Sequence, residues 1–215
     1  AHSLLLQRAT LESSADGILV VNNNGKWQSH NQKFLDMWHI PESISSCGDD
    51  DVVINFVLEQ LKYPHVFVQK IAALRAAPEE TSCDEVLFKD GRVFERFSIP
   101  QVMDGKTIGR VWSFRDVTAR KQAESFVERN AEILEMIASG KSASSIYDAL
   151  ALMYEARHQG MRCSLLELKG TKLMHGGAPS LPKEYCDAVD GLEFGPSVGS
   201  CGTSTYTGKR VLVEN

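Results

Sequence analysis

The sequence has little that would place it in a membrane or on nucleic acid. Its longest apolar stretches, such as residues 18–21, are far too short to cross a bilayer. No basic segment followed by a long apolar one opens the chain, so we expect no signal peptide. The net charge of −5 disfavours a nucleic-acid partner, which usually meets a basic surface. We therefore expect a cytoplasmic protein with neither a membrane nor a nucleic-acid partner.

Motifs of metal binding and catalysis are also missing. The five cysteines are widely spaced and contain no Cys-x-x-Cys pair, which favours free thiols over a disulfide framework. The six histidines form no His-x-x-x-His pattern, so we expect no metal site. The glycine-rich tail lacks the P-loop pattern, and turn glycines are the preferred interpretation there. Cys201 lies between glycines, and we favour a small buried residue at a tight bend over a reactive thiol.

Turn residues and alternating apolar residues predict an α+β fold. Asn-rich residues 22–25 and two Asp-Gly turns separate segments that read as antiparallel strands. Asn31 is placed to cap a helix that ends before Pro41. Two more helices are expected between Asp49 and Ala77, the first with the apolar residues Val52, Phe56, Leu58 and Leu61. We predict one five-stranded antiparallel sheet with helices on one face, from strands at 18–21, 26–29, 82–88, 92–99 and 107–114.

Two stretches of the chain carry a resemblance to a known family. The first, ATLESSADGILVVNNNGKWQSHNQKFLDMW, resembles the opening of a PAS domain. The second, FKDGRVFERFSIPQVMDGKTIGRVWSFRDVTARKQAE, resembles its closing strands and the Asp-x-Thr junction that follows them. The resemblance covers about residues 5–123 and implies a sensory domain.

The step from the last strand into the next helix contains no Gly or Pro. The first N–H groups of that helix need acceptors, and Asp116 or Thr118 can supply one as an N-cap. The resemblance implies that this Asp and Thr couple the sheet to an output helix. The alternative is capping without signalling, and either role predicts a loss of roughly 1 kcal/mol on replacement by alanine.

Aromatic residues indicate a possible ligand cavity, although a plain hydrophobic core is the alternative. The sequence does not identify a cofactor, and an empty cavity is the alternative to flavin, which is the leading candidate, with Asn31 for hydrogen bonding and Trp38 for stacking. The helix after Asn31 contains no cysteine, which disfavours covalent flavin photochemistry. A haem would need an axial ligand, for which His65 is the one placed candidate. The proposed lining residues are Asn31, Phe34, Trp38, Phe56, Trp112 and Phe114.

The predicted helix after the junction carries a short heptad pattern at Phe126, Asn130, Ile133 and Ile137. Such a seam, with an Asn to set the register, favours a parallel two-helix contact in a homodimer. Packing of the helix on its own domain is the alternative.

A second resemblance begins near residue 142. EARHQGMRCSLLELKG and FGPSVGSCGTSTYTGKRVLVEN look like the first half of a GAF domain, and we expect a partial α/β unit of that kind. The expected divisions are a PAS sensory domain at 1–118, a linker helix at 119–140 and the GAF-like part at 141–215.

Together these features predict a sensory and regulatory module without a catalytic motif of its own. It would bind a small ligand or cofactor and relay its state to an output domain of the same polypeptide beyond residue 215. The architecture resembles the input region of cyclic-di-GMP enzymes or histidine kinases. A dimerisation scaffold with an empty core is the alternative.

Overall fold

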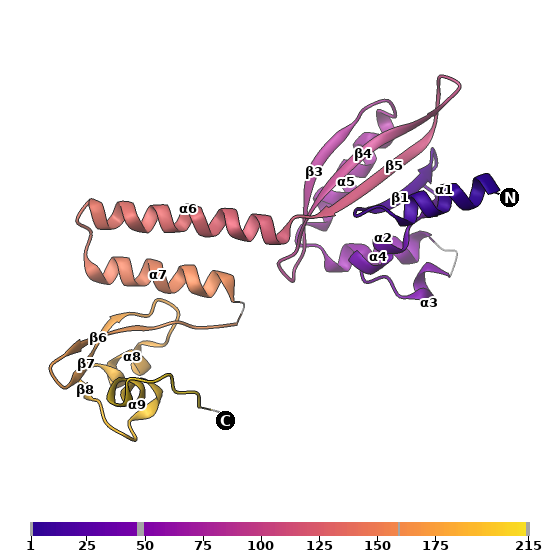
Figure 1. Cartoon of the computed structure of the whole chain (residues 1–215). Helices are drawn as coiled ribbons and strands as arrows, with labels where there is room; N and C mark the ends of the chain where they lie inside the picture. Colours follow the sequence, from indigo (N-terminus) through magenta and orange to yellow (C-terminus); the bar gives the residue numbers. More distant parts are fainter. Residues whose placement is uncertain (1, 47–49, 159, 214–215) are drawn as a thin grey trace. The chain divides into compact units, whose positions relative to one another are not determined.

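The computed structural model describes residues 2–46, 50–158 and 160–213. Two compact units make up the chain, Ala1–Lys121 and Gln122–Asn215 (Figure 1). Within the described residues, no helix is both long and apolar enough to cross a membrane. The prediction that involved Asp49 lies outside the described residues, and the helix there begins at Asp50.

The first unit is built on one antiparallel sheet of five strands, in the order β2-β1-β5-β4-β3. This confirms the predicted α+β fold. The two long strands extend further than predicted, because their pairing continues up to a tight turn at Asp104 and Gly105, both with positive φ. The strands are β1 (Gly17–Asn22), β2 (Trp27–His30), β3 (Ser82–Leu87), β4 (Val93–Met103) and β5 (Lys106–Asp116).

Helices cover one face of this sheet and close the core (Figure 1). Asn31 caps α2 as predicted, since its side chain accepts a hydrogen bond from the Phe34 N–H. The apolar face predicted for α4 is correct in part: Phe56 and Leu58 pack against the core and Leu61 is buried. Val52 is exposed, and Val53 and Val57 are buried in its place. The helices are α1 (His2–Glu12), α2 (Gln32–Met37), α3 (Glu42–Ser45), α4 (Asp50–Gln60) and α5 (Pro64–Ala76).

A β-bulge sets which side chains of the two central strands face the helices. At Gln101 and Val102 the pairing of β4 with β5 shifts by one residue, and beyond it Ser98 lies opposite Trp112. Successive side chains of a strand point to opposite faces of the sheet. Without this shift, the β5 side chains that now point outward would lie beside the inward-pointing side chains of β4. The bulge therefore places Trp112 and its alternate neighbours over the core.

The second unit contains a three-stranded sheet in the order β6-β7-β8, with helices around it. The turn expected around Cys201 was wrong, because Gly199–Thr207 forms helix α9. Position 202 of that helix requires a residue without a side chain, because a Cβ there would lie only 2.8 Å from the Cβ of Val198. The elements are α6 (Thr118–Ala138), which begins in the first unit, α7 (Ala143–Arg157), β6 (Leu165–Lys169), β7 (Lys172–Gly177), α8 (Lys183–Val189), β8 (Leu192–Glu193) and α9.

Candidate ligand cavity and strand-to-helix junction

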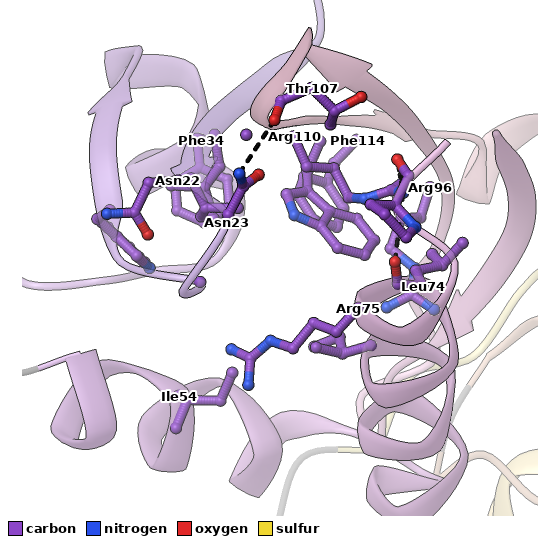
Figure 2. A pocket seen from close by; sticks show the side chains of 18 of the residues that line it. Asn22, Asn23, Phe34, Ile54, Leu74, Arg75, Arg96, Thr107, Arg110 and Phe114 are labelled. Atoms are coloured by element: carbon purple, nitrogen blue, oxygen red, sulfur yellow. Dashed lines mark hydrogen bonds between the residues drawn. The ribbon is translucent and has the colours of Figure 1, made fainter. Parts of the chain in front are cut away.

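A cavity of about 570 Å³ lies between the sheet and helices α2, α4 and α5 of the first unit (Figure 2). Its volume is in the range of small-molecule sites. Four of the six predicted lining residues do line it, namely Phe34, Trp38, Trp112 and Phe114. Trp27 lines it too, so all three tryptophans of the protein face this one space.

Asn31 is not among the lining residues, and its amide is already engaged. Its Oδ1 accepts hydrogen bonds from the N–H groups of Ile18 (2.8 Å) and Phe34 (3.0 Å). Its Nδ2 donates to the carbonyls of Leu11 (3.0 Å) and Asp16 (2.9 Å). The side chain is fully buried and joins α1, β1 and α2. It is therefore not available to bind a flavin ring.

Two other sequence candidates also lie away from the cavity. Phe56 is half-buried and packs against the core. The residues that α4 contributes to the cavity wall are Val53, Ile54 and Val57. His65 is exposed on α5 and is not among the lining residues, so the position proposed for a haem ligand does not open into the cavity.

A buried arginine on β4 was not predicted. Arg96 lines the cavity and is 1% exposed. Asp84, directly opposite on β3, binds it through two hydrogen bonds, Nε to Oδ1 (3.0 Å) and Nη2 to Oδ2 (2.5 Å). The guanidinium carbon lies 4.4 Å from the centroid of the Phe67 ring and 5.3 Å from that of Trp112. A paired charge between aromatic faces is a stable way to bury a guanidinium.

Two donors on the cavity wall have no acceptor among the described residues. They are Nη1 of Arg96 and Nε1 of Trp38, and both atoms are buried. Their side chains flank the same ring, since the Trp38 and Phe67 ring centroids are 6.0 Å apart. A buried donor without an acceptor is unfavourable by about 1–3 kcal/mol, and by more when charged. An acceptor within hydrogen-bonding reach of either atom would remove this penalty.

A second arginine of the wall is used to hold the fold. Arg110 on β5 donates to Ser98 Oγ (2.9 Å) and to the carbonyls of Glu80 (2.9 Å) and Pro78 (3.0 Å). It thereby ties the segment after α5 to the sheet. Burial lowers the pKa of the Arg110 guanidinium, and the nearby Glu80 carboxylate opposes that change.

Polar and basic side chains line the open side of the cavity. Figure 2 shows Arg75 extending from α5 toward the side where Asn23 lies, and Asn23 Nδ2 donates to the Thr107 carbonyl (3.0 Å). A Cβ on Gly25 would lie 2.0 Å from Nη2 of Arg75, and the φ of Gly25 is +82°. Glycine at this turn therefore leaves room for the guanidinium at the rim.

The junction between β5 and α6 uses the two predicted polar residues in different ways. Asp116 Oδ1 accepts a hydrogen bond from the Thr118 N–H (2.9 Å), which satisfies one free donor of the first helical turn. The Thr118 hydroxyl instead accepts from the Val93 N–H (2.9 Å) on β4. The Val117 N–H donates to the Val93 carbonyl (3.0 Å). The start of α6 is thus attached to the same strand that carries Arg96.

Charged residues reinforce this attachment on the other face of the sheet. Glu85 on β3 and Glu95 on β4 lie directly opposite each other. Like charges so placed destabilise a sheet. Lys121 pairs with Glu85 (2.6 Å) and Arg120 pairs with Glu95, so two cations of α6 compensate the two carboxylates.

The four heptad residues of α6 lie on one side of the helix but differ in their exposure. Ile133 is buried, and the Arg157 guanidinium of α7 lies 5.5 Å from the centroid of the Phe126 ring. Asn130 and Ile137 are exposed. Part of the predicted seam is therefore covered within its own unit, and part of it is exposed.

Comparisons with known proteins identify the first unit. A family model described as PAS fold matches residues 11–125, more than half of the chain. The chain belongs to the PAS family. The match begins within α1 and ends within α6, so this PAS region contains both the cavity and the junction.

One curated relative is named as a sensor. The methyl sulfide methyltransferase-associated sensor of Methanosarcina acetivorans is 37% identical over 102 residues, which cover 46% of this chain and 10% of that protein. The match spans only about a tenth of the relative's length.

Solved PAS structures are similar at lower identity. The PAS domain of BvgS from Bordetella pertussis is 16% identical with a TM-score of 0.44, covering 61% of this chain and 98% of that one. The PAS domain of an HTR-like protein from Haloarcula marismortui is 19% identical with a TM-score of 0.39, covering 54% and 92%.

Within the part of the chain that the structure describes, no three His, Cys, Asp or Glu side chains gather in a way that would hold a metal ion. The chemistry present in the PAS cavity is that of hydrogen bonding, aromatic contact and positive charge.

Proposed function

We propose that this chain is a sensory module whose PAS domain binds a small molecule and relays its presence through Asp116, Thr118 and α6 to an output domain of the same polypeptide. One observation carries the proposal: β4 forms the cavity wall through Arg96 and holds the start of α6 through Val93 and Glu95. The curated relative that is named a sensor supports the same role.

The relay works as a shift between two arrangements of the strand and helix. Arg96 and Glu95 are neighbours on β4 whose side chains point to opposite faces. A ligand that moves β4 at Arg96 therefore also moves Glu95, which pairs with Arg120 on the opposite face of the sheet. A ligand changes this equilibrium only if it binds the two arrangements with different affinity.

A cavity-filling substitution tests the relay without any ligand. Ile71, half-buried on α5, lines the cavity, and Ile71→Phe places extra apolar volume where a ligand would sit. We expect amide hydrogen exchange in the first two turns of α6 to change by about fivefold or more, the lower end of typical coupling energies. Val68→Phe adds the same bulk to an exposed position of α5 and should leave α6 unchanged. Unaltered exchange in α6 of a folded Ile71→Phe protein would contradict the proposal.

A junction variant should remove this response. Thr118→Val keeps the side-chain shape but loses the hydroxyl that accepts from the Val93 N–H, so we expect about 1 kcal/mol lower stability. The double variant with Ile71→Phe should show no additional change in α6 exchange. Thr10→Val, which removes a hydroxyl bonded to the Leu6 carbonyl in α1, is the matched control. A response that persists with Thr118→Val would assign the junction to capping alone.

The proposed module acts as a homodimer, through a seam shifted from the one expected. The residues Ala123, Val127, Asn130, Leu134 and Ile137 recur at spacings of four and three, and all are exposed. Apolar residues repeated in this way, with one Asn, are typical of a two-helix contact. The buried Ile133 instead belongs to the interior of its own unit.

Sedimentation equilibrium of the whole chain tests the dimer. Leu134→Glu with Ile137→Glu places two like charges in the seam, so we expect the dimer to dissociate at least tenfold more readily, equivalent to about 1.4 kcal/mol. Glu128→Gln, also exposed on α6 but outside the seam, should have no effect. A double variant that dimerises as well as the parent would rule out this seam.

The remaining parts of the proposal are the GAF-like nature of the second unit and a cytoplasmic location. The resemblance of residues 142–215 to the first half of a GAF domain is accompanied by the sheet β6-β7-β8 and the helix α7 beside it. Cys201, half-buried within α9, is assigned a packing role.

A further inference from the structure

The geometry points to a small organic anion with a flat apolar body, an aromatic or unsaturated carboxylate, as the molecule that the PAS cavity binds. We infer that one carboxylate oxygen accepts from Nη1 of Arg96 and that the ring lies among the tryptophans. This inference rests on the proposed ligand-binding function and specifies the chemical class of the ligand.

The charge of the cavity favours an anion although the whole protein is acidic. Among the described residues that line it, Glu79 is the acidic one, against four basic residues. Asp84 and Glu80, which lie next to the wall, still leave an excess of positive charge. The basic lining residues are Arg75, Arg96, Arg110 and Lys106.

The free donor on Arg96 limits the shape of the anionic group. Asp84 already occupies Nε and Nη2, so Nη1 is the donor left for a ligand, whose oxygen reaches this buried atom only when the side chains around it give way. One amino group of a guanidinium suits a single oxygen of a monoanion better than a phosphate, which needs several donors. A carboxylate at this point also gains a charge-assisted hydrogen bond in a site shielded from water.

The aromatic side chains of the cavity wall favour a flat, unsaturated apolar part in the ligand. The three tryptophans, Phe34, Phe67 and Phe114 present aromatic surface to the cavity. Edges and faces of rings attract each other at centroid separations of about 4.5–7 Å, so a flat unsaturated body gains more than a saturated one. Nε1 of Trp38 is a second donor for a polar substituent.

Tryptophan fluorescence of the whole chain tests the class of ligand, because all three tryptophans line the cavity. The probes are phenylacetate, its neutral isostere phenylacetamide, acetate, which has charge but no ring, and phenylphosphonate. We expect saturable emission changes with phenylacetate at an affinity at least tenfold above that of the amide or the phosphonate. Acetate should show no saturable change.

Removal of the charged pair supplies the second arm. The double variant Asp84→Asn with Arg96→Met should bind phenylacetate and phenylacetamide with affinities that agree within about twofold, since it removes the cation and leaves no uncompensated buried charge that would prevent folding. Asp16→Asn with Arg115→Met removes another bidentate pair of the PAS domain, away from the cavity, and should keep the tenfold preference.

Each result decides the inference. Equal binding of acid and amide by the parent chain would overturn the anionic class while leaving a ligand-binding cavity. Failure of every probe to change the emission would overturn it as well. In both cases the cavity-filling test with Ile71→Phe still decides the proposed relay, because it uses no ligand.

Discussion

Replacing Asp84 with asparagine is expected to lower the free energy of unfolding of the PAS domain by about 3 kcal/mol. Asparagine retains an acceptor but removes the charge that compensates the guanidinium of Arg96, which is 1% exposed. Breaking a buried pair by removing one partner typically destabilises by about 3–5 kcal/mol. The lower end applies because the Asp84 side chain is 28% exposed and water reaches it. Urea unfolding followed by tryptophan emission measures the loss.

The double variant with Arg96→Met is the control for this prediction. When both charges are absent, no uncompensated cation remains, and the partly exposed amide introduced at position 84 can bind water. We expect the double variant to regain most of the stability that Asp84→Asn loses. A loss under about 1 kcal/mol in the single variant, or further destabilisation in the double variant, would show that the pair does not act as described.

Asn31→Ala is expected to destabilise the PAS domain by at least about 3 kcal/mol. Four backbone groups each lose a hydrogen bond at once, two N–H donors and two carbonyls, although the Phe34 N–H and the Leu11 carbonyl keep a backbone partner. Each buried group left without a partner is unfavourable by about 1–3 kcal/mol, reduced where water can enter. The expected loss of stability includes the loss of the N-cap of α2, because Asn31 is that cap.

Asn23→Ala is the matched substitution for Asn31→Ala. Asn23 is exposed, and its amide donates one hydrogen bond, to the Thr107 carbonyl. We expect its replacement to change stability by less than about 0.5 kcal/mol, as is usual for surface positions. Similar losses for the two variants in the same urea experiment would refute the role of Asn31 as the link between α1, β1 and α2.

The sheet and the cap of α2 were predictable because local chemistry determines them. Asp-Gly turns and alternating residues identify antiparallel partners, and Asn31 stands before an apolar helix where a capping residue is expected. The face of α4 was not predictable, because several of its residues are apolar all around the helix and tertiary packing selected Val53 and Val57.

Arg96 illustrates a signal that was present in the sequence but missed. The turn at residues 89–91 pairs Phe88 with Arg92, and counting back from it places Asp84 opposite Arg96. An Asp–Arg pair at an inward position of a strand indicates a buried ion pair. By contrast, the bulge at Gln101 has no local signal that sets its position, so the facing residues of β5 required the structure.

The charged contacts between α6 and the outer face of the sheet respond to ions in solution differently from the pair under the cavity. Arg120 is about half exposed, so salt at physiological strength, with a Debye length of about 8 Å, weakens its attraction to Glu95. The buried pair of Arg96 is screened much less. Rising ionic strength therefore loosens the attachment of the helix while the cavity keeps its charge, so salt would weaken the proposed relay more than the proposed binding of an anion.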